Sequence, residues 1–285
     1  MVQTGGQATD PEPGQDANAV YALGSSPGES ARLLRQADEL AADSAALLDK
    51  VRLRPGQSAI DLGCGPRGVL DLLAERVSPG GRVVGLDADP LHTAMAAEFA
   101  AERRLDGVEV MTADARSTGL PSGSFDLVHA RTLFINLPEP AGVAVEMARL
   151  ARPGGWVAAM EPDTEHALCY PPHPAFARVS EIFRVVFSRN GADITMGRRV
   201  PELFRRAGLA DVEVEARVQM YPPGNSRRTV RLDLVRAMRP MVLEMGVATA
   251  AELDELDAAL RPHLTHPDTI LMTGLLFLTW GRKPA

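Results

Sequence analysis

The sequence predicts an α/β protein with a doubly wound, mostly parallel sheet of seven strands, helices on both faces and a helical lid insert. Two observations predict this fold. Short apolar runs alternate with segments of helical periodicity from residue 58 onward, and the first run leads into a glycine-rich turn. In folds of this class, ligands bind beyond the carboxyl ends of the strands.

The expected elements follow one another along the chain. Residues 30–50 have the spacing of an amphipathic helix, and Pro55-Gly56 turns the chain into the first strand. The predicted strands are 58–62, 82–87, 108–112, 125–130, 156–161, 211–220 and 276–282. The helices predicted between them are 69–76, 90–104, 141–150 and 200–207.

The turn Asp61-Leu-Gly63-Cys-Gly65-Pro-Arg-Gly68 is the most informative motif of the chain. Its glycines allow a tight turn and let a ligand lie against the main chain, while the next helix offers free backbone amides. The spacing also fits a dinucleotide fingerprint, so the glycines alone leave a nicotinamide site and an adenosyl site open.

The acidic residues around this turn favour the adenosyl site. Asp61 would repel a pyrophosphate but would favour the ammonium and sulfonium groups of a cationic ligand. Asp87, at the end of the second strand, is predicted to accept the two ribose hydroxyls, as either kind of site requires. Asp114, beyond the third strand, is predicted to accept the adenine amino group.

Further motifs follow in a defined order. They are Val84-Gly-Leu-Asp87, Thr112-Ala-Asp114-Ala, Ser124-Phe-Asp126-Leu-Val and Leu150-Ala-Arg-Pro-Gly-Gly155. In this order they resemble the class I S-adenosylmethionine-dependent methyltransferases, which have a Rossmann-like fold. The resemblance covers roughly residues 45–165 and a closing segment, 277–283, and is strongest to small-molecule enzymes related to the ubiquinone and menaquinone C-methyltransferases. The chain departs from the family at Arg67, where a third glycine is usual.

The resemblance implies S-adenosylmethionine as cofactor, S-adenosylhomocysteine as product and no metal. It implies methyl transfer to O, N or C of a small, largely apolar acceptor, such as a quinone or a natural product. Tyr21 and the helix that carries Arg32 and Gln36 resemble a lid over the cofactor. The implied cofactor-binding residues are Tyr21, Gln36, Asp61, Gly63, Cys64, Gly65, Asp87, Ala88, Thr112, Ala113, Asp114, Ala115, Ala130 and Arg131.

A methyl acceptor that must lose a proton needs a base, and three residues are candidates. His129 and Glu161 end the fourth and fifth strands, and His166 follows in the next segment. Each has a structural alternative. His129 could be a buried residue behind the cofactor, Glu161 could cap a helix or pair with an arginine, and His166 could be exposed on a loop.

The chain divides into segments by composition and periodicity. We expect a disordered tail at 1–18, N-terminal lid helices at 19–50, a cofactor-binding core at 51–165 and core continuations at 198–224 and 274–285. Segments 166–197 and 225–273 are inserts, and we expect them to fold over the carboxyl edge as a lid that shapes a substrate pocket.

Composition excludes several classes of function. The 285-residue chain has a net charge of −7, so no overall basic field attracts nucleic acid. The clusters Arg198-Arg199 and Arg227-Arg228 with Arg231 are expected to be solvated faces or charges at a substrate mouth. We expect neither a signal peptide nor a membrane span. Cys64 and Cys169 indicate neither a disulfide framework nor a metal cluster, and this small number of thiols fits a cytoplasmic enzyme.

Two alternatives remain at this stage. A nicotinamide-dependent oxidoreductase would share the glycine spacing, although Asp61 and Asp114 argue against it. A protein that keeps the cofactor fold for another reaction, such as a cyclisation, or as a binding module is favoured only by Arg67.

Overall fold

The computed structural model describes residues 26–285, so the predicted tail 1–18 and Tyr21 lie outside the described residues. Its sheet has the strand order β3-β2-β1-β4-β5-β8, with β7 and the short β6 also paired to β8. Strands β1 to β5 are parallel and β8 runs antiparallel to its three neighbours. The strands are β1 Ser58–Leu62, β2 Arg82–Asp87, β3 Val108–Thr112, β4 Phe125–Arg131, β5 Ala151–Asp163, β6 Leu168–Tyr170, β7 Ala210–Met220 and β8 Ile270–Arg282.

The seven predicted strands are all present, and β6 is an eighth that the sequence analysis missed. Strand β8 is longer than expected, because it begins at Ile270 rather than at residue 276. Its pairing with β5 starts at Leu275, which leaves the first residues of β8 free on that side, and β6 pairs with them. The first insert thus covers a sheet edge that would otherwise be open.

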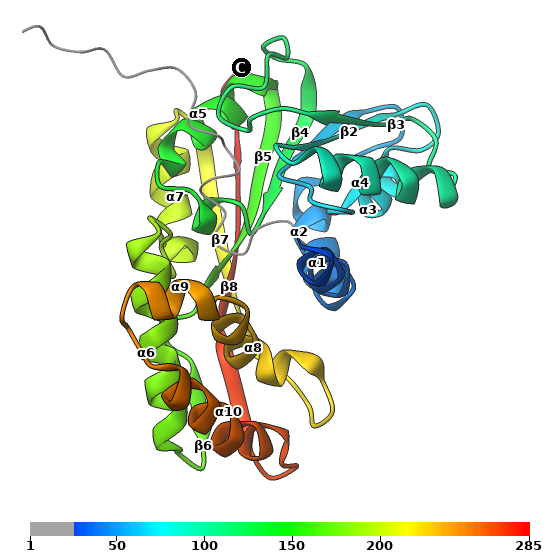
Figure 1. Cartoon of the computed structure of the whole chain (residues 1–285). Helices are drawn as coiled ribbons and strands as arrows, with labels where there is room; N and C mark the ends of the chain where they lie inside the picture. Colours follow the sequence, from blue (N-terminus) through cyan, green and yellow to red (C-terminus); the bar gives the residue numbers. More distant parts are fainter. Residues whose placement is uncertain (1–25) are drawn as a thin grey trace, which may run out of the picture.

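Helices cover both faces of the sheet, as predicted (Figure 1). The core on one face joins α2, α3 and α4 to side chains such as Ala59 and Leu127, and the core on the other joins α5 and α7 to Ile60 and Val128. Neighbouring strand residues thus alternate between the two cores, as a pleated sheet requires. The helices are α2 Ala41–Val51, α3 Leu70–Val77, α4 Pro90–Glu102, α5 Pro140–Leu150 and α7 Met196–Arg206.

The two inserts together form one helical cap. Their helices are α6 Pro174–Arg189, η3 Ser226–Thr229, α8 Val230–Ala237, α9 Arg239–Glu244 and α10 Ala250–Thr265. A third core contains side chains of both inserts, among them Phe183, Leu232 and Leu260. Figure 1 shows these helices gathered at one end of the molecule, beyond the carboxyl ends of the parallel strands.

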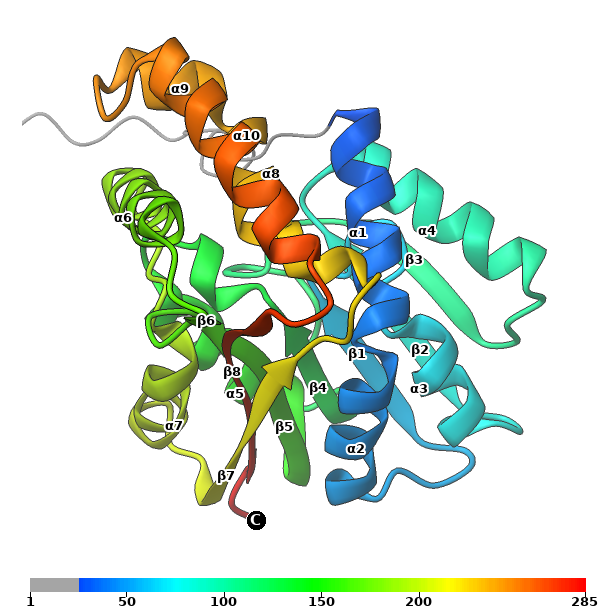
Figure 2. The same ribbon diagram turned by 90° about the horizontal axis from the view of Figure 1, so that it is seen from below.

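Helix α1 (Pro27–Glu39) connects the sheet to this cap. Ser26 caps its first turn by accepting the Glu29 amide at 3.2 Å. At its far end Asp38 pairs with Arg67 of the glycine turn, and Glu39 lies 3.4 Å from Arg227 of η3. Figure 2 shows α1 between the cap helices and α4. Among the described residues, no helix combines the length and apolarity that a membrane span requires.

Candidate functional site

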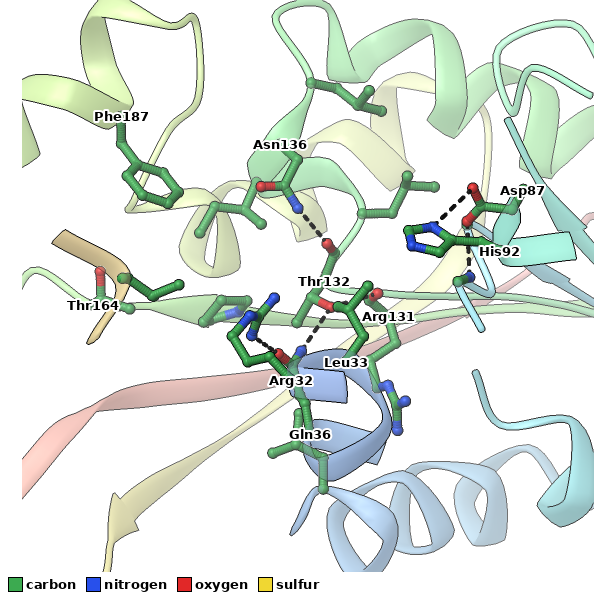
Figure 3. Close-up of a pocket in the computed structure, with 18 of the residues that line it drawn as sticks. Arg32, Leu33, Gln36, Asp87, His92, Arg131, Thr132, Asn136, Thr164 and Phe187 are labelled. Atoms are coloured by element: carbon green, nitrogen blue, oxygen red, sulfur yellow. Dashed lines mark hydrogen bonds and ion pairs between the residues drawn. The ribbon is translucent and has the colours of Figure 1, made fainter. Parts of the chain in front are cut away.

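A large cavity lies at the carboxyl ends of the strands, between the sheet, α1 and the cap. Its wall includes the glycine turn, the residues after β2, β3 and β4, and residues of α1, α6 and α8. Figure 3 shows Asp87 and His92 at one end and Thr164 and Phe187 at the other, with Thr132 and Asn136 between them. The cavity is therefore long enough to present two chemically different ends.

The glycine turn lines the cavity beside Asp87. Gly63, Gly65 and Gly68 have φ values of +68°, +56° and +57°, which glycine alone adopts without strain. A Cβ at Gly68 would lie 2.1 Å from Asp61 Oδ2, so this glycine lets the chain pass over the buried carboxylate. Gly68 thus makes the turn in this chain, one residue after position 67, where the family usually has its third glycine.

Arg67, the departure from the family pattern, has a structural explanation. Its guanidinium pairs with Asp38 of α1 and, at 2.7 Å, with Asp71 of α3, and it lies over the Phe99 ring at 4.9 Å. The residue fastens α1 to the turn. Its side chain is not among those that line the cavity.

Asp87 is oriented toward the cavity by backbone amides. Its Oδ2 accepts the Gly65 amide at 2.8 Å and its Oδ1 accepts the Asp89 amide at 2.9 Å. His92 of α4 lies beside it, with Nδ1 3.8 Å from an oxygen of Asp87 and also of Asp89. The Asp87 carboxylate raises the pKa of His92, and the buried Nε2 of His92 has no partner among the described residues.

Asp114 also lines the cavity, and Arg116 holds it by bonds of 2.6 to 3.0 Å to both carboxylate oxygens. The bond to Arg116 lowers the pKa of Asp114, which keeps it ionised. Leu86 and Ala115 line the same end and supply apolar surface. The carboxylates of Asp87 and Asp114 and an apolar surface thus surround this end of the cavity.

Asp61 lies beneath the glycine turn rather than on the cavity wall. It is 1% exposed, and its Oδ2 accepts the Val69 amide at 3.0 Å. Its Oδ1 lies 2.8 Å from Nδ1 of His129, which is fully buried. The two residues meet because they are in register on β1 and β4 and therefore project from the same face of the sheet.

Glu161 is buried and accepts three backbone amides. These belong to Leu133, Phe134 and Ile135 of the 3₁₀ turn η2 (Phe134–Asn136) and lie at 2.7, 2.9 and 3.2 Å. Burial raises the pKa of Glu161 to about 8, and the three amide bonds act in the opposite direction. Glu161 thus fixes the loop after β4, which supplies Thr132 and Leu133 to the cavity wall.

The structure does not bring the three candidate bases to the cavity. His129 and Glu161 are buried with protein partners, and the side chain of His166 is 61% exposed and lies 3.8 Å from Glu165. None of the three lines the cavity. Each therefore has the structural alternative foreseen from the sequence, and a catalytic role for any of them stays a prediction.

Most of the expected cofactor residues do surround the cavity. Those on its wall are Gln36, Gly63, Gly65, Asp87, Ala88, Asp114, Ala115 and Arg131. Gln36 donates to the Thr132 hydroxyl at 3.2 Å, and Arg32 donates to Gln36 at 2.6 Å, so these residues share a face of α1 as predicted. Those off the wall, besides Asp61, are Cys64, Thr112, Ala113 and Ala130.

His92 was not predicted as a cavity residue, because a histidine inside an apolar helix carries no motif.

The Arg227-Arg228-Arg231 cluster is divided by the fold. Arg227 and Arg231 line the cavity, whereas Arg228 is buried and donates to four backbone carbonyls, those of Tyr221, Leu264, His266 and Thr269. Within residues 26–285, no group of acidic, cysteine or histidine side chains is arranged to hold a metal, and both cysteines are free.

Comparison with known proteins agrees with this geometry. Residues 60–159 match the family model described as methyltransferase domain. The nocamycin O-methyltransferase of Saccharothrix syringae is 49% identical over 110 residues, 38% of this chain and 39% of that protein. The demethylmenaquinone methyltransferase of a Geobacillus strain is 26% identical over 180 residues, 59% of this chain and 77% of that protein.

Solved structures share the fold at low identity. The cyclase SpnF has a TM-score of 0.51 at 19% identity, over 85% of this chain and 82% of that one. The chain spans 39% to 55% of the length of several curated relatives that it matches. The fold, the motifs and the match of residues 60–159 to a methyltransferase domain agree with the resemblance to the class I S-adenosylmethionine-dependent methyltransferases.

Proposed function

We propose that this protein transfers a methyl group from S-adenosylmethionine to an oxygen, nitrogen or carbon atom of a small, largely apolar metabolite. The observation that carries the proposal is a single cavity with two different ends. One end has the glycine turn, Asp87 and Asp114, and the other has apolar side chains of the cap, among them Phe187 and Leu234.

The residues at the first end fit the cofactor. Gly63 and Gly65 line the cavity with positive φ, so the main chain is open to a ligand at this point. Each Asp87 oxygen accepts one backbone amide and keeps a lone pair for a ribose hydroxyl. The orphaned Nε2 of His92 offers a further polar contact at the same end.

When bound beside Asp87 and the glycine turn, the cofactor would supply an electrophilic methyl group to an oxygen, nitrogen or carbon nucleophile, whose O–H, N–H or C–H proton would leave to solvent or to a base. The chain's own task is to align the reactants and to exclude water. The cap and α1 do this by enclosing the cavity, and Glu161 does it by holding the loop that carries Thr132 and Leu133.

Cofactor affinity is expected to depend on Asp87. Asp87→Ala removes a charged acceptor from two ribose hydroxyls, and each charge-assisted bond contributes roughly 1.5–3 kcal/mol. We expect calorimetric affinity for S-adenosylmethionine to fall at least about tenfold. Asp49→Ala, an exposed carboxylate on α2, is the control and should leave affinity unchanged. Unchanged affinity in a folded Asp87 variant would remove this residue from the site.

Two measurements test the function itself. Calorimetry with S-adenosylmethionine and, separately, with NADH is expected to show binding of the first alone, because Asp87, Asp89 and Asp114 outnumber Arg116 at this end and the negative balance disfavours a pyrophosphate. Mass analysis of the product is then expected to show the gain of one methyl group. A product of unchanged mass would instead support a rearrangement such as cyclisation.

Arg67, the one feature that favoured the alternative of a non-methylating scaffold, now has a packing role that leaves the turn intact. The proposal includes a cytoplasmic location, which the two free cysteines support. It also includes a small-molecule partner rather than nucleic acid or membrane, which the net charge of −7 supports.

A further inference from the structure

Arg231 of α8 is an enclosed cation without an anionic partner. It lines the cavity, and within residues 26–285 no carboxylate lies within ion-pair distance of its guanidinium. Its bonds go to neutral oxygens instead: the Ser180 hydroxyl at 2.8 Å and the carbonyls of Thr164 and Thr273 at 2.7 and 3.3 Å. Burial lowers the pKa of Arg231 to about 10, so the side chain remains charged at neutral pH.

The guanidinium is held in place, but not all of its hydrogen-bond donors have an acceptor. All three bonds use Nη1 and Nη2, which leaves the Nε–H without an acceptor among the described residues. The rings of Phe183 and Phe176 lie 5.4 and 5.8 Å from it. Arg228, three residues earlier, is different. Its Nε and both Nη atoms donate to four backbone carbonyls, as in a purely structural arginine.

Two unused hydroxyls accompany Arg231. Thr164 and Thr273, whose carbonyls accept its bonds, both line the cavity. The hydroxyl oxygen of each is buried and has no hydrogen-bond partner among the described residues. Buried hydroxyls are normally paired, so two orphans beside one unneutralised cation indicate an absent ligand that accepts hydrogen bonds.

The carboxylates on the cavity wall lie at one end. Among the described residues they are Asp87, Asp89 and Asp114, which end or follow β2 or β3 at the cofactor end, where Arg116 pairs with Asp114. Thr164, which accepts a bond from Arg231, lies at the opposite end in Figure 3, near Phe187. The acceptor end is therefore positive and partly aromatic, a combination that suits an apolar acid.

We propose that the methyl acceptor carries a carboxylate, which Arg231 binds with the help of the Thr164 and Thr273 hydroxyls, and that Arg231 selects acids over their neutral analogues. This inference rests on the proposed function and adds the substrate class to it. Arginine suits the role because it stays charged and its free Nε–H can donate a charge-assisted hydrogen bond to a carboxylate oxygen. The aromatic side chains Phe183 and Phe187 then contact the apolar body of the acid.

Binding of acid and amide pairs tests the inference without knowledge of the natural substrate. The probes are hydroxynaphthoic acids and their carboxamides, titrated by calorimetry into the protein saturated with S-adenosylhomocysteine. We expect the wild type to prefer the acid at least about tenfold in one or more pairs, the value of one charge-assisted bond. In Arg231→Gln the preference should fall to about twofold or less, while Arg231→Lys should keep part of it.

Arg236→Gln is the matched control, since this exposed arginine on the same helix loses the same charge away from the cavity. It should keep the full preference. Equal affinity of acid and amide in every pair, including no binding of either, overturns the inference while a wild type that binds S-adenosylmethionine still supports the proposed function. An equal loss for acid and amide in a folded Arg231→Gln shows a structural arginine and also overturns the inference. A wild type that fails to bind S-adenosylmethionine defeats the proposed function itself.

Discussion

Replacing Glu161 with alanine is expected to lower the free energy of unfolding by at least about 3 kcal/mol. The substitution leaves three buried or half-buried amides, those of Leu133, Phe134 and Ile135, without an acceptor, and each such loss costs roughly 1–3 kcal/mol. Denaturant unfolding monitored by circular dichroism measures the change. Glu139→Ala, an exposed glutamate that caps nothing with its side chain, should stay within about 0.5 kcal/mol of the wild type.

The same residue gives stability a pH dependence of known sign. Burial raises the pKa of Glu161 to about 8 in the folded protein, above the value of about 4.3 of an unfolded glutamate. Between these values the folded state binds more protons than the unfolded state, so its contribution to stability is complete below about pH 4.3 and is lost as pH rises through about 8.

Glu161→Gln isolates this effect, because glutamine keeps one acceptor oxygen and cannot ionise. The wild type is expected to lose stability relative to Glu161→Gln between about pH 5 and pH 8, by up to about 1.4 kcal/mol per pH unit. A difference that is flat over this range would mean that the amide bonds outweigh burial and keep the carboxylate ionised.

Local sequence signals were sufficient to predict the central sheet. Alternating apolar runs located every strand from β1 to β5, and the glycine turn fell where the cavity is. A lid made of 166–197 and 225–273 was expected, but the contacts that join the two inserts were not. Their shared core, for example Phe183 against Leu232, depends on contacts between distant segments that periodicity does not encode.

For the site, residues that belong to a spaced motif were easier to find than those that depend on tertiary position. Asp87 and Asp114 follow strands and line the cavity, as predicted. His129 also follows the pattern of a strand end, but the pleat directs its side chain below the turn. Arg231 was noticed only as part of a charge cluster, since the absence of a counter-ion is visible only in three dimensions.

Asp61→Ala is expected to destabilise the protein by about 2–6 kcal/mol, because it leaves two buried donors without an acceptor and each such loss costs roughly 1–3 kcal/mol. The loss removes the acceptor for the Val69 amide and for Nδ1 of His129, whose Nε2 already has no partner among the described residues. Because the two residues are in direct contact, a double-mutant cycle with His129→Ala should show a coupling of roughly 1.5–3 kcal/mol. Additive losses would show that the contact at 2.8 Å contributes little.

Ligand affinity separates this structural role of Asp61 from the electrostatic role that the sequence suggested. If the carboxylate acts on the cationic end of the cofactor, Asp61→Asn should weaken S-adenosylmethionine more than neutral adenosine. The structure favours equal losses for both ligands, because Asp61 is 1% exposed, has protein partners on both oxygens and lies off the cavity wall. Titration of the two ligands into the folded variant decides between these roles, and a selective loss of the cationic ligand would mean that the field of Asp61 reaches the cofactor through the turn.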